Sequence, residues 1–298
     1  MESTSRRPVV VGLDRSPQCW AAVEYAAGMA ERRGVPLLAL HAYEPSQYTV
    51  RSTVGWTPDN DGVLRNVSER LVADAVDVVT MSHPGLEVLT RMEPGSATEQ
   101  LLEASRQATA VVLGSRGTGG FADLVIGSTA LHVAGHAECP VIAVPAPDEE
   151  AALPHRGVVV GVDGSAVSEP AIEFAFETAA DLGEPLTAVH AWYDVTRTGT
   201  GRMMPLGYDP TEKLEEERLA LAESMAGWQE KFPEVEVHHR VTLGDHPVAT
   251  LVRKSRDARL LVVGCRGRSA VRSVLLGSVS HGVLHHAKVP VAVVHGDH

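Results

Sequence analysis

The stretch AVVLGSRG (residues 110–117) places four apolar residues directly before a Gly-x-x-Gly loop, and LLVVGCRG (residues 260–267) repeats the pattern 150 residues later. Such an apolar run followed by glycine is typical of a buried strand that ends in a turn. After nine further residues each copy has a Gly-Ser pair, Gly127-Ser128 or Gly277-Ser278. Each copy therefore predicts a glycine loop between a strand and a helix, which is a place where proteins hold phosphate groups.

The similarity between the two halves of the 298-residue chain extends beyond these loops. Val11-Gly12-Leu13-Asp14 recurs as Val160-Gly161-Val162-Asp163, and His136-Ala137 recurs as His286-Ala287. An internal repeat of this length indicates a tandem duplication, so both halves should share one fold. A short acidic segment with nearby prolines separates them, as expected of an exposed linker. The predicted domains are 1–147 and 157–298, joined by the linker 148–156.

Short apolar runs alternate with helical segments in both halves. In the first half we expect strands near 9–14, 37–43, 86–92, 110–114 and 140–144, and helices near 17–33, 62–81, 97–107 and 128–137. In the second half we expect strands near 158–163, 186–192, 235–242, 260–264 and 290–294. This alternation predicts an α/β fold in which each domain is a doubly wound, five-stranded parallel sheet with strand order 3-2-1-4-5.

In that strand order, strands 1 and 4 are neighbours where the order reverses, and ligands bind there beyond the carboxyl ends of the strands. Asp14 and Asp163 follow the two first strands, where they could accept hydrogen bonds from ribose hydroxyls or an adenine amino group. A helix-capping role fits these aspartates as well. The loop glycines have little bulk and can adopt positive φ, so backbone N–H groups can approach phosphate, and the helices that follow add unpaired N–H groups.

The motifs Gly-x-x-Gly-x9-Gly-Ser, Val-Gly-x-Asp and His-Ala-x-x-Pro-Val together resemble the universal stress protein family, and in particular its ATP-binding branch. Both halves match over nearly their full length. The resemblance implies a Rossmann-like fold of the adenine nucleotide alpha hydrolase-like type. It also implies ATP as ligand, with Mg²⁺ bound through the phosphates, a homodimer, and a regulatory role in stress with a protein partner that the sequence does not identify. The implied nucleotide contacts are Gly12, Asp14, Gly114, Ser115, Arg116, Gly117, Gly127, Ser128 and Thr129 in the first half, and Gly161, Asp163, Gly264, Cys265, Arg266, Gly267, Gly277, Ser278, Val279 and Ser280 in the second.

Two features of the motif leave alternatives open. The family often has a hydroxyl two residues after the Gly-Ser serine, as at Ser280, but the first half has Ala130 there. Phosphate contacts in the first site are therefore expected to be weaker, unless Thr129 compensates. Arg116 and Arg266 could either reach phosphate or pair with an acidic helix face.

Composition excludes several other classes of protein. The net charge of −12, from 26 basic and 38 acidic residues, disfavours binding to nucleic acid, which relies on neutralising phosphates. No apolar run approaches the ~18 residues of a membrane span, so we expect no membrane insertion and a cytoplasmic location. The three cysteines are too few and too scattered for a disulfide framework or a Cys-x-x-Cys metal site, which predicts reduced thiols.

The favoured function is an ATP-binding regulatory module with no catalytic residue assigned. No Gly-x-x-x-x-Gly-Lys motif is present, which argues against a kinase or P-loop ATPase. The alternative is a slow ATP hydrolase or nucleotidyl-transfer enzyme in which Asp14 or His41 positions water. Histidine pairs at i, i+4, such as His132 with His136 and His281 with His285, could hold zinc, but no acidic or cysteine partner has a matching spacing. We therefore interpret them as solvated helix faces and assign no metal site.

Overall fold

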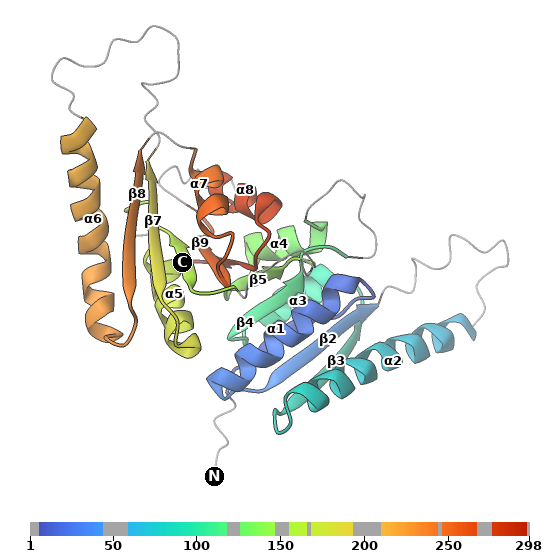
Figure 1. Ribbon diagram of the computed structural model, residues 1–298. Helices are drawn as coiled ribbons and strands as arrows, with labels where there is room; N and C mark the ends of the chain where they lie inside the picture. Colours follow the sequence, from blue (N-terminus) through green and yellow to red (C-terminus); the bar gives the residue numbers. More distant parts are fainter. Residues whose placement is uncertain are drawn as a thin grey trace, which may run out of the picture. The chain divides into compact units, whose positions relative to one another are not determined.

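The computed structural model describes residues 6–43, 59–117, 126–146, 155–165, 168–192, 210–243, 246–266 and 276–296. The chain divides into two compact units, Met1–Pro147 and Asp148–His298 (Figure 1). Most of the predicted linker 148–156 lies outside the described residues. Each unit is an α/β domain, in agreement with the prediction from the sequence.

The first unit alternates strands and helices along the chain. Its elements are β1 (Val9–Gly12), α1 (Pro17–Arg33), β2 (Leu37–Tyr43), α2 (Asp59–Ser82), β3 (Val88–Pro94), α3 (Ala97–Ser105), β4 (Ala110–Gly114), α4 (Ser128–His136) and β5 (Val141–Val144). The strands pair in the order β3-β2-β1-β4-β5, and the pairs are parallel. This confirms the predicted strand order 3-2-1-4-5.

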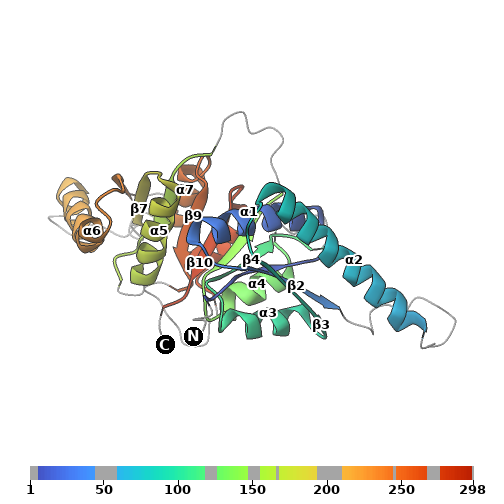
Figure 2. The same ribbon diagram turned by 90° about the horizontal axis from the view of Figure 1, so that it is seen from below.

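Helices cover both faces of this sheet. Helices α1 and α2 pack on one face, and α3 and α4 pack on the other (Figure 2). The central strand β1 is consequently sealed from water, and Val9, Val10 and Val11 are fully buried. Because helices cover both faces of this strand, the side chains on neither face are exposed to water, which explains its continuous apolar sequence.

The second unit repeats this architecture. Its elements are β6 (Val158–Gly161), α5 (Glu169–Leu182), β7 (Leu186–Trp192), α6 (Pro210–Lys231), β8 (Val237–Leu243), α7 (Pro247–Lys254), β9 (Leu260–Gly264), α8 (Ser278–His286) and β10 (Val291–Val294). The strand order β8-β7-β6-β9-β10 is again 3-2-1-4-5 within the unit. Helices α5 and α6 pack against each other, as do α7 and α8 (Figure 1).

The third strand of each unit begins later than predicted. Strand β3 starts at Val88 rather than near residue 86, and β8 starts at Val237 rather than near residue 235. Each is an edge strand with one pairing partner, so its start follows the start of that partner. Leu37 is in register with Val88, and Leu186 is in register with Val237. Helix α2 starts at Asp59, three residues before the predicted start at residue 62.

The ends of α1 follow from local chemistry. Pro17 occupies the first helical position, where its missing N–H costs nothing, and Gly34 ends the helix with a left-handed φ of 61°. Ser16 occupies the N-cap position, but its side chain makes no capping hydrogen bond. Its hydroxyl donates to Oδ1 of Asp14 instead, at 2.5 Å. The carboxylate, rather than the helix, therefore orients this serine.

None of the described helices has the length and apolar character that a membrane crossing requires.

Candidate functional site

Two neighbouring strand ends bring the predicted aspartate and glycine loop of the first unit together. Strands β1 and β4 are parallel, with Val9 in register with Ala110, so their carboxyl ends lie at the same edge of the sheet. Asp14 follows β1 and Gly117 follows β4. A Cβ atom added to Gly117 would lie 2.9 Å from Oδ2 of Asp14. The carboxylate therefore lies directly against the glycine loop.

The second unit has the same arrangement of strand ends. Strands β6 and β9 pair in parallel, with Val158 in register with Leu260, and Asp163 follows β6. Gly264 is the last residue of β9, and the loop residues Cys265 and Arg266 follow it. Gly267, the last residue of this Gly-x-x-Gly motif, lies outside the described residues.

Both aspartates are fixed by hydrogen bonds to the turn that follows them. Oδ1 of Asp14 accepts from the backbone N–H of Ser16 at 2.9 Å and from its hydroxyl at 2.5 Å. Oδ1 of Asp163 accepts from the same two groups of Ser165 at 2.9 and 2.5 Å, and also from the hydroxyl of Ser168 at 2.7 Å. Hydrogen bonds to a carboxylate are strong, so each side chain is held in one orientation. Ser16, Ser165 and Ser168 are not among the predicted site residues, although the repeated Asp-x-Ser pattern is a signal for the first two.

The glycine loops are tied to the helices that follow them. In the first unit, the N–H of Gly127 donates to the carbonyl of Ser115 at 2.6 Å, and the N–H of Ser115 donates to that of Val144 at 2.7 Å. In the second unit, the N–H of Gly277 donates to the carbonyl of Cys265 at 2.8 Å, and the N–H of Cys265 donates to the carbonyl of Val294 at 2.7 Å. The residue after the strand is thus buried and immobilised, at 8% exposure for Ser115 and 4% for Cys265.

Helices α4 and α8 begin beside these loops with uncapped ends. Gly127 and Gly277 occupy the N-cap positions, and neither helix has a side-chain capping hydrogen bond. The first-turn N–H groups have no partner within an α-helix, and the helix dipole adds partial positive charge there. Ser128 and Ser278 are exposed at these ends. Each end can therefore receive an anion through backbone N–H groups and a hydroxyl.

Glycine at the loop positions provides space rather than unusual backbone angles. Gly114, Gly117 and Gly127 all lie outside the set of described glycines with positive φ, which differs from the expectation that such angles shape the loop. A Cβ atom on Gly114 would lie 3.1 Å from Cβ of Gln18 in the first turn of α1. The close approach of α1 to the end of β4 thus accounts for this glycine.

Packing also accounts for the glycines that end the first strands. A Cβ atom on Gly12 would lie 2.5 Å from Cδ2 of Leu113, and one on Gly161 would lie 3.1 Å from Cδ1 of Leu251. Contacts of these two residues with a nucleotide stay a prediction.

The position two residues after the Gly-Ser serine differs between the units in the way that the sequence indicates. The hydroxyl of Ser280 is buried, 3.0 Å from the carbonyl of Cys265 and 3.0 Å from that of Gly277. Ala130 has no such group. In this structure the Ser280 hydroxyl therefore joins the loop to the helix, and its predicted contact with phosphate would require rotation about χ1.

The two loop arginines differ in exposure, since Arg116 is exposed and Arg266 is half-buried. In the part of the chain that the structure describes, neither guanidinium forms an ion pair with an acidic side chain. The proposed alternative of pairing with an acidic helix face thus gains no support from the described residues.

A histidine lies beneath each aspartate. Nδ1 of His41 donates to the carbonyl of Leu13 at 2.8 Å, and Nε2 lies 3.2 Å from the hydroxyl of Ser68. Nδ1 of His190 donates to the carbonyl of Val162 at 2.7 Å. Its Nε2 lies 3.1 Å from Oε2 of Glu217, close enough for an ion pair but not aligned as a hydrogen bond. Both nitrogens of His41 are engaged, which does not favour its role as a base that positions water.

The cysteines are free and buried. Burial raises the pKa of the Cys19 thiol to about 11 and that of Cys139 to about 12. Burial also raises the pKa of Cys265, although Arg266 opposes the effect. A protonated thiol is a poor nucleophile and a poor metal ligand, so none of these side chains is activated for chemistry.

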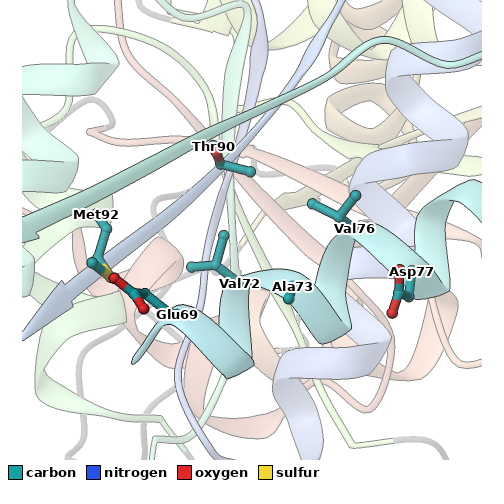
Figure 3. Close-up of a pocket in the computed structure, with 7 residues that line it drawn as sticks. All are labelled: Glu69, Val72, Ala73, Val76, Asp77, Thr90 and Met92. Carbon is teal, nitrogen blue, oxygen red and sulfur yellow. The ribbon is translucent and has the colours of Figure 1, made fainter. Parts of the chain in front are cut away.

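Other features lie away from the strand ends. A groove of about 390 Å³ lies between α2 and β3 (Figure 3), and none of the predicted site residues lines it. The rings of His132 and His136 stack with centroids 4.0 Å apart, and those of His281 and His285 lie 4.5 Å apart. Within the described residues, no three His, Cys, Asp or Glu side chains are grouped to hold a metal ion.

Comparison with known proteins points to one family. The sequence profile of the Universal stress protein family matches residues 5–145 and again residues 155–295. A universal stress protein of Mycobacterium tuberculosis is 36% identical over 296 residues, which cover 96% of this chain and 95% of that protein. One from Mycolicibacterium smegmatis is 35% identical over 303 residues, covering 99% of both chains. The crystal structure of a universal stress protein from Archaeoglobus fulgidus matches with a TM-score of 0.70 at 20% identity, over 98% of this chain and 99% of that one, which supports the fold.

Proposed function

Because this chain belongs to the universal stress protein family, we propose that each unit binds one molecule of ATP and that occupancy of the two sites regulates conformation or partner binding. Family membership places the chain among stress-response proteins. The observation that carries the proposal is the meeting of an anchored aspartate with a glycine loop and an uncapped helix end, in the first unit at Asp14, Gly117 and Gly127.

The loop and the helix end would hold the phosphates. The N–H groups at the start of α4 and the hydroxyls of Ser128 and Thr129 would bind the phosphates. The first turn of α4 contains no acidic residue, so no carboxylate of the helix competes with phosphate for these groups. The same holds for the N–H groups of α8 and the hydroxyl of Ser278, whereas the Ser280 hydroxyl would first have to rotate away from the carbonyls of Cys265 and Gly277. Arg116 and Arg266 follow in the loops and would add positive charge. A triphosphate held in this way needs no P-loop lysine.

The aspartates would hold the nucleoside. With Oδ1 of Asp14 committed to Ser16, Oδ2 is directed to the glycine loop and can accept from a ribose hydroxyl. Mg²⁺ would be bound through the phosphates, because the described residues contain no cluster of protein ligands for it. Such a site would recognise ATP by its charge and its shape, and the protein residues would orient the bound nucleotide.

A regulatory role fits the side chains around the site better than a catalytic one. His41, the candidate for positioning water, donates to a backbone carbonyl with one nitrogen and meets Ser68 with the other. We include homodimer formation and a regulatory protein partner in the proposal, because the family resemblance implies both.

The test is equilibrium dialysis of the purified chain against radiolabelled ATP with and without Mg²⁺, followed by chromatography of the bound nucleotide. We expect close to two ATP per chain, recovered intact. Recovery of ADP or AMP in proportion to incubation time would replace the regulatory proposal with slow hydrolysis. Absence of binding at millimolar ATP would overturn the proposal.

A further inference from the structure

The two aspartates share one anchor and differ in a second. The shared anchor is the serine two residues later, Ser16 or Ser165, whose N–H and hydroxyl both donate to Oδ1. The second anchor lies five residues after each aspartate, where the first unit has Cys19 and the second has Ser168.

The sulfur and the oxygen at this position meet the aspartate backbone in the same way. Sγ of Cys19 accepts from the N–H of Asp14 at 3.4 Å, and Oγ of Ser168 accepts from the N–H of Asp163 at 3.4 Å. Only Ser168 also donates to the carboxylate, at 2.7 Å from Oδ1 of Asp163. Among the described contacts of Cys19 there is no bond from its thiol to the Asp14 carboxylate. Sulfur is the weaker donor, which explains the difference.

Both side chains act from below the surface. Cys19 is 1% exposed and Ser168 is 7% exposed, so a bound nucleotide would touch the aspartates and not these residues. An additional charge-assisted hydrogen bond restrains rotation of the Asp163 carboxylate and thus lowers the entropy that a ligand must remove. Asp14 has one restraint fewer at this oxygen.

We propose that Ser168 is a positioning residue that presents the Asp163 carboxylate to the ribose of ATP and makes the second unit's site the tighter one, while Cys19 leaves the first site weaker. The inference rests on the proposed function, since it concerns how each ATP site is tuned.

The experiment isolates one site at a time in the full chain. Ser278→Asp places a negative charge at the phosphate end of the second site, and Ser128→Asp does so in the first. Cys19→Ser is made in the Ser278→Asp protein, and Ser168→Cys and Ser168→Ala are made in the Ser128→Asp protein. Dissociation constants for ATP and for 2′,3′-dideoxy-ATP are measured by isothermal titration calorimetry, with circular dichroism as the check on folding.

We expect Cys19→Ser to tighten ATP binding at the first site and Ser168→Cys to weaken it at the second, each by about fivefold, the effect of one hydrogen bond. The affinity for 2′,3′-dideoxy-ATP should change less than twofold, because this ligand has no ribose hydroxyl for the aspartate to hold. A purely structural role would change both affinities alike. Cys19→Ser keeps the inference testable if the Ser168 variants do not fold.

The outcomes separate this inference from the function on which it rests. If neither single-site protein binds ATP, the proposed function fails and the inference fails with it. If both bind ATP but the exchanges leave the affinities unchanged, or shift both nucleotides equally, only the positioning role of Ser168 is overturned.

Discussion

Oδ2 of Asp14 lies so close to Gly117 that a Cβ atom on this glycine would be 2.9 Å away, a separation that real Cβ atoms essentially never show. Gly117 does not have positive φ, so the backbone alone would accept another residue. Glycine fits here because the Asp14 carboxylate, which is anchored through Oδ1 to Ser16, occupies the space that a side chain would need. The proposed nucleotide site and the sequence motif therefore meet in this one contact.

Gly117→Ala should weaken ATP binding at the first site by at least about tenfold, because the methyl group displaces either the loop or the Asp14 carboxylate. Gly117 is exposed, so the free energy of unfolding should change by less than ~1 kcal/mol. Calorimetric titration of both the wild type and the variant measures the affinity. In an Asp14→Ala background the same substitution should have little further effect, since the two residues are coupled through their contact. An equal loss in both backgrounds would show that Gly117 acts independently of Asp14.

We expect Gly→Ala to have opposite effects on the free energy of unfolding at two helical glycines. Gly282 of α8 has no room for a Cβ atom, which would lie 2.6 Å from Cγ2 of Val248, whereas Gly227 of α6 is exposed with open space around it. Gly282→Ala should lower the free energy of unfolding by about 1–3 kcal/mol through overpacking. Gly227→Ala should raise it by about 0.5–1 kcal/mol through helix propensity. Urea unfolding of both variants checks the signs, and stabilisation by Gly282→Ala would contradict the packing of α7 against α8.

The sequence predicts the fold well because the signals that decide it are local and occur twice. The apolar runs at 110–113 and 260–263 locate the fourth strand of each unit. The alternation of strands and helices indicates a parallel sheet, for which few strand orders are possible. This brings Asp14 to the Gly117 loop without any knowledge of side-chain positions. The start of β3 was placed too early because it depends on the register with Leu37, a contact between distant residues that no local pattern records.

The candidate site is less predictable than the fold for the same reason. Leu113 occupies the space that a side chain at Gly12 would need, and Gln18 does so at Gly114. These glycines therefore have packing roles, which the sequence alone does not distinguish from contacts with a ligand. The Ser280 hydroxyl meets the carbonyl of Cys265, fifteen residues away, which spacing alone does not indicate. The hydrogen-bond partner of a hydroxyl depends on tertiary geometry. The positions of the glycines and aspartates, in contrast, depend on the local turns that follow the strands.

His83 should make the stability of the first unit depend on pH. Its Nδ1 lies 2.8 Å from Oε2 of Glu31 and its Nε2 lies 3.1 Å from Oε1 of Glu24, so both nitrogens face carboxylates of α1. Burial lowers the pKa of His83, but the hydrogen bonds to Glu31 and Glu24 outweigh it and the net pKa is raised. The stabilisation is then complete below the ordinary histidine pKa near 6.5 and is lost as the pH rises through the raised value. We expect the urea midpoint to fall as the pH rises above about 6.5, and His83→Gln to remove this fall.

Ser82→Ala is the matched control for the histidine. It removes the hydrogen bond from Ser82 to Oε2 of Glu24, at 3.0 Å, and leaves the imidazole in place. This variant should be somewhat less stable at every pH but should keep the pH dependence of the wild type. A midpoint of His83→Gln that still falls above pH ~6.5 would assign the dependence to another group.

Ser280→Ala should lower the free energy of unfolding by about 1 kcal/mol, the net contribution of one buried hydrogen bond. The carbonyl of Cys265 keeps its bond from Gly277, so no buried acceptor is left without a partner. The reciprocal change Ala130→Ser should stabilise the first unit, since the carbonyl of Ser115 lies at the equivalent position. Chemical denaturation measures both effects. An unchanged stability with a large loss of ATP affinity would instead show that the hydroxyl rotates to bind phosphate.

Ser128→Asp tests the phosphate end of the first site. A carboxylate in the first turn of α4 interacts favourably with the helix dipole, so the free energy of unfolding should stay the same or rise by about 0.3–1 kcal/mol. The same charge repels and displaces phosphate at this helix end, so the ATP affinity of the first site should fall more than about tenfold. Ser128→Asn has nearly the same shape without the charge and should weaken binding much less. Calorimetric titration and thermal unfolding of the two variants measure both quantities. Equal affinities for the Asp and Asn variants would mean that phosphate does not approach the N-terminus of α4, and ATP would then have to be held by the loop at Gly117 alone.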